Sequence, residues 1–347
     1  MSDVASPRGL ARCEEDRPGP AAGAAPPPVD DAVLTDLCDR LFAQLSRSDQ
    51  RARGLKYVRG LLATPGRRSF RNMAAHLGGS ATLEQRLHHF VSCSTWDWMP
   101  MRRALAAYMA ELAPPRAWVL RPLLVPKEGD NTVGVHKRYV PALGQMLNVQ
   151  YSVGLWAASS VLPYPVSWRL LLPRDWLDDD ARRAQVAIPD GLAAENPAEC
   201  AVEAYLGLAA HRDGDLPVRP VVLAVGDADA ATAVRKLRAA GVPFVVGADR
   251  RPAALDGLDD LLLFRTQTHP DSGPGRAWVT NMHDAGPDEL TSLARLVDTV
   301  DDSFRNTTDR IGMTDFTGRT FNGWNRHATL VSAAHCVTLL SAQTAPS

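Results

Sequence analysis

The segment from Pro217 to Val246 places the strongest constraint on the fold of this chain. It contains an apolar stretch, PVRPVVLAV (217–225), then a helical pattern over 230–240 and a second apolar stretch at 242–246. A strand–helix–strand unit within one sheet forms a right-handed crossover, which makes its two strands parallel. Gly241, directly after the helical pattern, is typical of the residue that ends a helix in the left-handed conformation. The chain therefore requires at least one parallel strand pair with a helix packed against the sheet.

Further strands are predicted on both sides of this unit. Apolar or alternating stretches cover residues 117–125, 132–140, 146–159, 166–172, 261–265 and 276–281. The stretch at 146–159 alternates with period two around Tyr151 and Val153, as expected for a strand. Helical patterns at 199–211 and 288–297 lie between or after these strands. The sequence therefore predicts an α/β fold with a mixed sheet flanked by helices.

The region before residue 115 is predicted to be entirely helical. Apolar residues at helical spacing indicate helices at 30–45, 47–62, 70–77, 83–92 and 101–112. Residues 1–28 are rich in Pro, Ala and Gly without periodicity, which predicts a disordered tail. We therefore expect a disordered tail (1–28), a helical N-terminal domain (29–114), an α/β domain (115–340) and a flexible tail (341–347).

Composition limits the classes of function that need to be considered. Of 347 residues, 45% are hydrophobic and 22% are charged, as in an ordinary globular protein. No apolar run reaches the roughly 18 residues of a membrane span, and the N-terminal region lacks the apolar core of a signal peptide. We therefore expect a cytoplasmic protein without a membrane partner. Five widely spaced cysteines, an odd number without any CxxC pair, favour reduced thiols: Cys13, Cys38, Cys93, Cys200 and Cys336.

A run of basic residues lies in the N-terminal helical region. Its members are Arg47, Arg51, Arg53, Lys56, Arg59, Arg67, Arg68 and Arg71. Such a face is either simply solvated or makes contacts to a phosphate backbone, which needs cations but no sequence code. Because the formal net charge of the whole chain is -1, DNA binding would depend on this local surface.

Residues 300–330, VDDSFRNTTDRIGMTDFTGRTFNGWNRHATL, carry the most specific pattern in the chain. They indicate a helix, a turn around Gly312 and a second helix. The order of its acidic, aromatic, glycine and basic residues resembles the C-terminal signature of DDE-type insertion-sequence transposases. The G-W-x-R-H part of that signature is present as Gly323, Trp324, Arg326 and His327.

The resemblance implies an RNase H-like domain preceded by a helical, DNA-binding type of N-terminal region. It also implies magnesium or manganese ions held by three carboxylates for DNA cleavage and strand transfer. The first carboxylate position of the family falls at Arg121, the second at Val225 or Asp227, and the third at Asp302. The family's helix lysine falls at Thr308. We expect a structural role for the G-W-x-R-H residues, because a Trp and a His on a closing helix more often pack and hydrogen-bond against the preceding helix than react.

The departures at these positions predict that DNA cleavage and strand transfer are lost, because the residues of a metal site act as a unit. The remnant of the triad is then Asp302 and Asp227, with a cation at Arg121. The first hypothesis is a domesticated DNA-binding or regulatory protein. No cofactor is assigned, and magnesium or manganese is expected only if nuclease activity survives. DNA or a small molecule remains the candidate partner, and the oligomeric state is not predicted.

Two alternatives remain open at this point. The former active-site cleft could serve a small-molecule enzyme, with Arg121 favouring an anionic ligand. Its candidate groups are Arg121, His136, Lys137, Arg138, Asp227, Asp229, Asp301 and Asp302. Alternatively, an active nuclease could use Asp227 or Asp229 together with Asp302 and Glu128. Each of these side chains also fits a salt bridge or a solvated loop, and Asp301 and Asp302 also fit a cap at a helix start.

Overall fold

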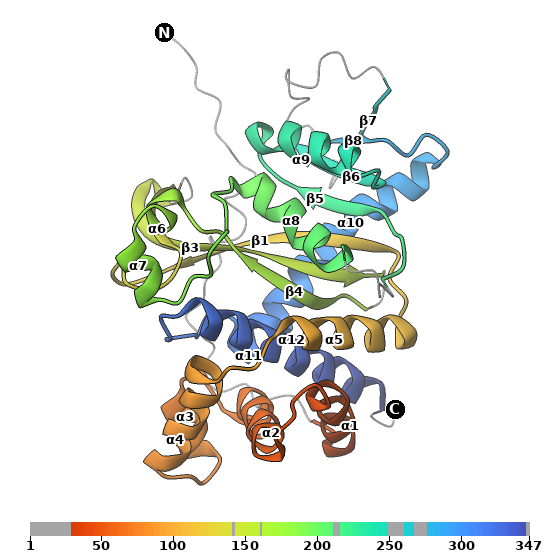
Figure 1. Cartoon of the computed structure of the whole chain (residues 1–347). Helices are drawn as coiled ribbons and strands as arrows, with labels where there is room; N and C mark the ends of the chain where they lie inside the picture. Colours follow the sequence, from red (N-terminus) through yellow and green to blue (C-terminus); the bar gives the residue numbers. More distant parts are fainter. Residues whose placement is uncertain are drawn as a thin grey trace.

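The computed structural model describes residues 29–140, 143–159, 162–210, 216–248, 260–266 and 276–344. The predicted disordered tail at 1–28 lies outside these residues. Figure 1 shows a central sheet, with helices α1 to α4 gathered at one end of the molecule beyond α5 and α12. The predicted α/β architecture with a helical N-terminal region is confirmed.

The helices include all those that the sequence predicts. They are α1 (Asp31–Phe42), α2 (Ser48–Ala63), α3 (Phe70–His76), α4 (Ala81–His88), α5 (Met99–Leu112), α6 (Arg174–Leu177), α7 (Asp180–Gln185), α8 (Pro197–Ala209), α9 (Asp227–Ala239), α10 (Pro287–Ser303), α11 (Asp309–Ile311) and α12 (Phe321–Thr344). Two π-helical turns, η2 (His89–Cys93) and η5 (Phe304–Thr308), continue α4 and α10. Because α12 runs to Thr344, the expected flexible tail is wrong for 341–344, and 345–347 lie outside the described residues.

The sheet is mixed. Its strands are β1 (Ala117–Pro126), β2 (Val135–Val140), β3 (Gln145–Ala158), β4 (Tyr164–Leu170), β5 (Val221–Ala224), β6 (Phe244–Ala248), β7 (Leu262–Arg265) and β8 (Ala277–Thr280). Their order is β2-β3-β1-β5-β6-β8-β7, with β4 also paired to β3. Strands β1, β5 and β6 are mutually parallel, which confirms the predicted crossover through α9. Gly241, with φ of 66°, ends that crossover helix in the left-handed conformation, as its position after α9 requires.

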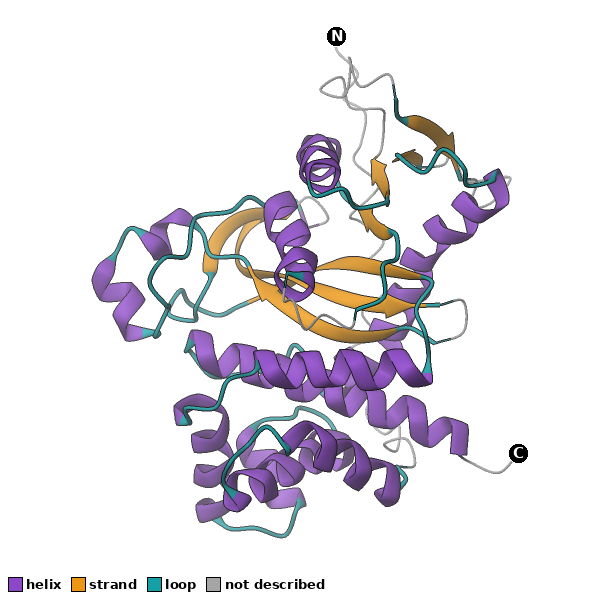
Figure 2. Cartoon of the chain, turned by 45° about the vertical axis from the view of Figure 1, so that its right-hand side comes forward, coloured by secondary structure: helices purple, strands orange, loops and turns teal. Residues whose placement is uncertain are grey.

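Both faces of the sheet are covered. Helix α8 packs against β1, β3 and β4, and α10 packs against β1, β5 and β6. These two helices lie on opposite sides of the sheet (Figures 1 and 2). Burial from both sides explains why β1 opens with five consecutive buried residues, Ala117–Arg121, instead of alternating.

Helix α12 joins the sheet to the N-terminal helices. It packs against β4 on one side and against α1, α2 and η2 on the other, as the layers of Figure 2 show. Residues 323–337 of this helix are all buried, so it has no solvated stripe. The boundary at 114/115 stays a prediction, since α12 packs on both sides of it. Among the described residues, no helix is long and apolar enough to cross a membrane.

A buried arginine fixes α12 against the sheet. Arg102 of α5 is 2% exposed, and its guanidinium donates to Thr329 Oγ1 at 2.8 Å and to the Trp168 carbonyl at 2.7 Å. It also donates to both the backbone and the side-chain oxygen of Asn325. Burial lowers the pKa of Arg102 to about 9, which still leaves the group charged at neutral pH. Neutral oxygens from α12 and β4 therefore solvate a buried cation.

Candidate functional site

Arg121 occupies the middle of β1, where the resemblance expects the first metal-binding carboxylate. It lies opposite Gly154 of β3, and the residue is 8% exposed. Its Nε donates to Asp301 Oδ1 at 2.7 Å, and its Nη1 donates to the Pro122 carbonyl at 3.2 Å. Its guanidinium carbon lies 3.7 Å from the centroid of the Phe304 ring, a cation–π arrangement. Thus an ion pair and an aromatic ring both engage the cation at this position.

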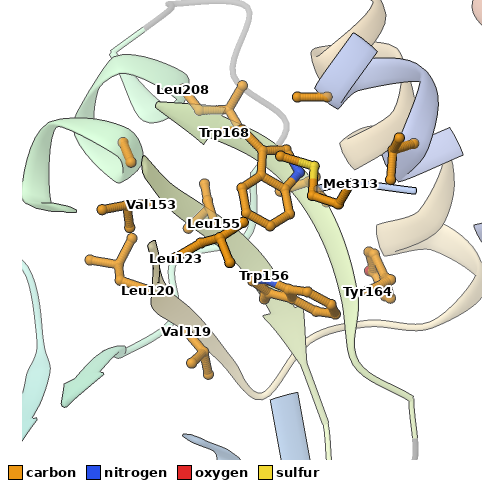
Figure 3. Packing of buried hydrophobic residues seen from close by; sticks show 14 of the residues in the cluster. Val119, Leu120, Leu123, Val153, Leu155, Trp156, Tyr164, Trp168, Leu208 and Met313 are labelled. Atoms are coloured by element: carbon orange, nitrogen blue, oxygen red, sulfur yellow. The ribbon is translucent and has the colours of Figure 1, made fainter. Parts of the chain in front are cut away.

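The aromatic surroundings of Arg121 come from β3, β4 and η5. Gly154 leaves room for indole rings, because a Cβ added there would lie 2.8 Å from atoms of both Trp156 and Trp168. These two tryptophans meet edge to face with ring centroids 6.5 Å apart, and Figure 3 shows them within the apolar core. Trp168 Nε1 donates to Ser332 Oγ at 3.0 Å, whereas the buried Trp156 Nε1 has no hydrogen-bond partner among the described residues.

The end of α10 places two neighbouring acids in different environments. Asp301 faces the sheet and pairs with Arg121. The side chain of Asp302 is 67% exposed and pairs instead with Arg305 at 2.7 Å. Asp302 therefore does not take the inward place expected for the third carboxylate, and Asp301 does. Because α10 begins at Pro287, the idea that these acids cap a helix start is wrong.

The second carboxylate position lies where β5 gives way to α9. The last paired residues of β1 and β5 are Leu120 and Leu223, so the turn after Ala224 begins beside the level of Arg121. Asp227 is the first residue of α9, but its side chain lies outside the described part of the structure. Val225 carries no ligand atom in its side chain.

The described residues do not fit a two-metal site. Within them, no group of three or more His, Cys, Asp or Glu side chains could hold a metal ion. Glu128 lies seven residues beyond Arg121 along the chain, roughly 23 Å at strand spacing, so it cannot join Asp301. A guanidinium has only donors and a positive charge, which excludes Arg121 itself as a ligand.

The residues predicted to line one cleft are divided between two faces of the sheet. Arg121 is opposite Gly154, and Lys137 is opposite Asn148, which places both on the same face of β3. Arg138 is opposite Leu147 and stacks at 5.2 Å on Tyr151, on the other face.

The second face also holds His136 and Asp229. His136 contacts the Gly134 carbonyl through Nδ1. Burial raises the pKa of Asp229, although Arg138 and the Ala198 N–H both act to lower it. The predicted single cleft is therefore corrected to two separate groups, because adjacent strand residues point to opposite faces.

The G-W-x-R-H residues hold helices together. His327 is buried, and its Nε2 donates to the Gly312 carbonyl at 3.0 Å while its Nδ1 accepts from the Tyr57 hydroxyl at 2.9 Å. Burial lowers the pKa of His327 to about 4, so the ring is neutral at pH 7. Arg326 donates to the carbonyl of Val91, within η2, and to the carbonyl of Trp96, three residues after η2 ends.

Two other motif residues make close packing contacts. Trp324 is 2% exposed. A Cβ on Gly323 would lie 2.8 Å from Thr320 Oγ1. The motif is thus a set of structural contacts between α12, α2 and η2.

The position of the family's helix lysine is internal. Thr308 ends η5 and is fully buried, and its hydroxyl donates to His335 Nδ1 at 2.9 Å. His335 Nε2 in turn contacts the Pro163 carbonyl at 3.2 Å. A residue at this position cannot reach a DNA phosphate.

The basic run divides into paired and exposed members. Arg47 and Arg53 share Asp49, and Arg59 pairs with Asp31. Arg51 donates to the Leu45 carbonyl, and Arg68 donates from its backbone to Asp315 and from Nε to the Leu61 carbonyl. The remaining members are exposed and make no ion pair within the described residues: Lys56, Arg67 and Arg71.

Two contributors, Phe304 and Arg102, were not among the predicted site residues. Asp301 was predicted as a candidate of the cleft but not as the acid that faces β1. Its inward place could have been recognised, since Asp301 lies four residues after Val297 and three before Phe304, on the apolar stripe of α10. Arg102 gave no such signal, because its partners come from residues 167–168 and 325–329, far away in the sequence.

The strand order, the parallel crossover and the helix that brings Asp301 to β1 define an RNase H-like, transposase-type nuclease fold. A family model described as DDE superfamily endonuclease matches residues 40–315. The chain therefore belongs to the DDE superfamily endonucleases. A search of curated proteins finds no match.

Proposed function

We propose that this protein binds nucleic acid and does not cleave it by metal-dependent chemistry. The observation that carries the proposal is the Arg121–Asp301 ion pair on β1 and α10. It places a cation at the first carboxylate position and neutralises the acid nearest to the third. Two-metal catalysis needs carboxylates free to bind divalent ions at those positions, so the pair argues against cleavage and strand transfer.

The proposed nucleic-acid contacts use the exposed cations of the N-terminal helices. Lys56, Arg67 and Arg71 are exposed, whereas Arg47, Arg53 and Arg59 are already paired with acids. Exposed cations gain affinity by releasing counterions from the phosphate backbone. We therefore expect the unpaired members to contribute most of the binding.

Binding can be tested by fluorescence anisotropy with a labelled duplex at about 0.1 M salt, where phosphate contacts are weakened but not abolished. The Lys56→Ala/Arg67→Ala/Arg71→Ala variant is expected to bind at least tenfold more weakly. The matched control, Arg47→Ala/Arg53→Ala/Arg59→Ala, removes the same charge from paired positions and is expected to lose less. Absence of binding by the wild type would overturn the proposal.

Cleavage is tested separately with supercoiled and linear DNA in magnesium or manganese. No nicking above that of a chelator control is expected. Cleavage that the Asp301→Asn variant abolishes would show that the site is active and would contradict the second half of the proposal.

A further inference from the structure

The ribbon formed by β2 and β3 exposes large apolar side chains beyond the main sheet. Tyr139 is 54% exposed, Met146 is 58% exposed and Leu143, near the ribbon's end, is 46% exposed. Tyr139 and Met146 are directly paired across the two strands, so their side chains lie together on one face. Scattered exposed apolar residues need no explanation, but a grouped set marks an interaction surface.

The next pair on the same face is polar. Lys137 is opposite Asn148, two residues along each strand from Tyr139 and Met146. The face therefore presents an aromatic ring and a thioether beside an ammonium group and an amide. Residues 135–150 contain Lys137 and Arg138 but no acidic residue, so the ribbon complements an anionic partner.

The other face of the ribbon is held against the protein. Val149 and Val140 are buried there, and Arg138 stacks on Tyr151. His136 on this face is tied to the Gly134 carbonyl. Because this side is fixed, the Tyr139 face points outward as a supported surface.

The ribbon continues into the basic surface of the N-terminal helices. The Lys127 backbone N–H donates to the Asn148 carbonyl at 2.8 Å, beside Lys137 in the sheet. The Lys127 ammonium donates to the Phe316 carbonyl at 3.3 Å, and burial together with the nearby Arg67 lowers its pKa. Arg67, Lys127 and Lys137 therefore form a basic band, which the exposed Glu128 interrupts.

We infer that the β2–β3 ribbon binds an unpaired nucleobase, with Tyr139 and Met146 as the stacking surface and Lys137 at the adjoining phosphate. This inference rests on the proposed nucleic-acid binding and adds the form of nucleic acid that it recognises. Aromatic stacking suits any base, because every base has a π face, and basic residues along the backbone complete such sites. The basic band would guide the adjoining duplex or strand toward Arg67.

The test compares three labelled probes by anisotropy: a single-stranded oligonucleotide, a blunt duplex and the same duplex with a single-stranded overhang. The Tyr139→Ala/Met146→Ala variant is expected to lose about tenfold or more in affinity for the single strand and the overhang. Its affinity for the blunt duplex should be unchanged. Tyr139→Trp should retain binding. The control variant Leu262→Ala/Leu263→Ala removes exposed apolar side chains from β7, at the other end of the sheet, and should bind all probes normally.

The binding results distinguish failure of the proposed function from failure of this inference alone. If the wild type binds none of the probes, both the proposed function and this inference fail. If the wild type binds but the ribbon variant binds every probe equally well, only the inference fails. Sedimentation is measured in parallel, and conversion of a wild-type dimer to a monomer in the ribbon variant would assign the face to a second copy of this chain and overturn the inference.

Discussion

The G-W-x-R-H motif and the region around Arg121 differ in how closely this chain follows the pattern expected of the family. At the motif, His327 and Arg326 make buried hydrogen bonds that join three helices. At the remnant site, Arg121 stands where a carboxylate is expected and pairs with Asp301. Loss of the motif would leave buried groups unpaired, whereas an acid that holds only a metal can be replaced if a new pair satisfies the charge. The motif residues therefore support the fold, whereas the residue at position 121 can differ from the family's carboxylate without leaving a buried charge unpaired.

The largest expected effect comes from the buried support of α12. Arg102→Met leaves the oxygens of Thr329, Trp168 and Asn325 without their donor, so the free energy of unfolding should fall by about 4 kcal/mol. Urea unfolding measures this change. Arg103→Met is the control on the same helix, because its buried Nε has no hydrogen-bond partner among the described residues. Equal losses in both variants would mean that the Arg102 contacts are not what holds α12.

Placing an acid at the remnant site tests the comparison directly. Arg121→Asp puts a carboxylate beside Asp301, and we expect it to lower the free energy of unfolding by about 3 kcal/mol in a chelator. Millimolar Mn²⁺ should recover part of that loss, because two carboxylates then attract a hard cation. Thermal unfolding with and without Mn²⁺ measures the recovery. Arg121→Met should be insensitive to Mn²⁺, and a comparable response of the wild type would contradict the assignment.

The buried histidine of the motif, His327, should make the free energy of unfolding depend on pH. Burial lowers the pKa of His327 to about 4 from an ordinary value near 6.5, so the unfolded chain binds a proton more readily. Its contribution to stability is complete above pH 6.5 and is lost as the pH falls to 4, about 3 kcal/mol in total. His327→Gln should remove this contribution, so that the free energy of unfolding falls less steeply between pH 7 and 4 than in the wild type. An unchanged slope would show that the ring is not buried in its neutral form.

The smallest effects separate the two neighbouring acids of α10. Asp302→Asn breaks an exposed pair with Arg305 and should change the free energy of unfolding by less than about 0.5 kcal/mol. Asp301→Asn removes the charge that faces Arg121 and should cost about 2 kcal/mol. Chemical denaturation of both variants provides the comparison. A larger loss of unfolding free energy in Asp302→Asn than in Asp301→Asn would show that Asp302, rather than Asp301, faces Arg121.

Much of the fold could be predicted because its signals are local. The apolar alternation around Tyr151 was sufficient to predict a strand there. The helical pattern between two apolar stretches was sufficient to predict the parallel crossover. Arg102 and its buried oxygens could not be predicted, because no local pattern distinguishes a solvated arginine from one that meets residues 227 positions away.

The candidate site was less predictable for a physical reason. The expected third acid differed by one residue, and one residue is about 100° around a helix, enough to exchange a buried position for an exposed one. The π-helical turn η5 after α10 changes the register again, so no simple helical spacing relates Asp301 to Thr308. The site depends on the direction in which each side chain points around the helix axis, and strand and helix patterns alone do not specify that direction.

The central place of α12 has a consequence for synthesis of the chain. Helices α1 and α2 leave the ribosome well before α12, the helix on which they pack. Their apolar faces must therefore wait through the translation of about 260 further residues, roughly 13 to 52 seconds at bacterial or eukaryotic elongation rates. The backbone N–H of Asp30, at the start of α1, finally donates to Ser341 Oγ near the end of α12. Nascent chains of this protein should consequently depend on holding chaperones until α12 emerges.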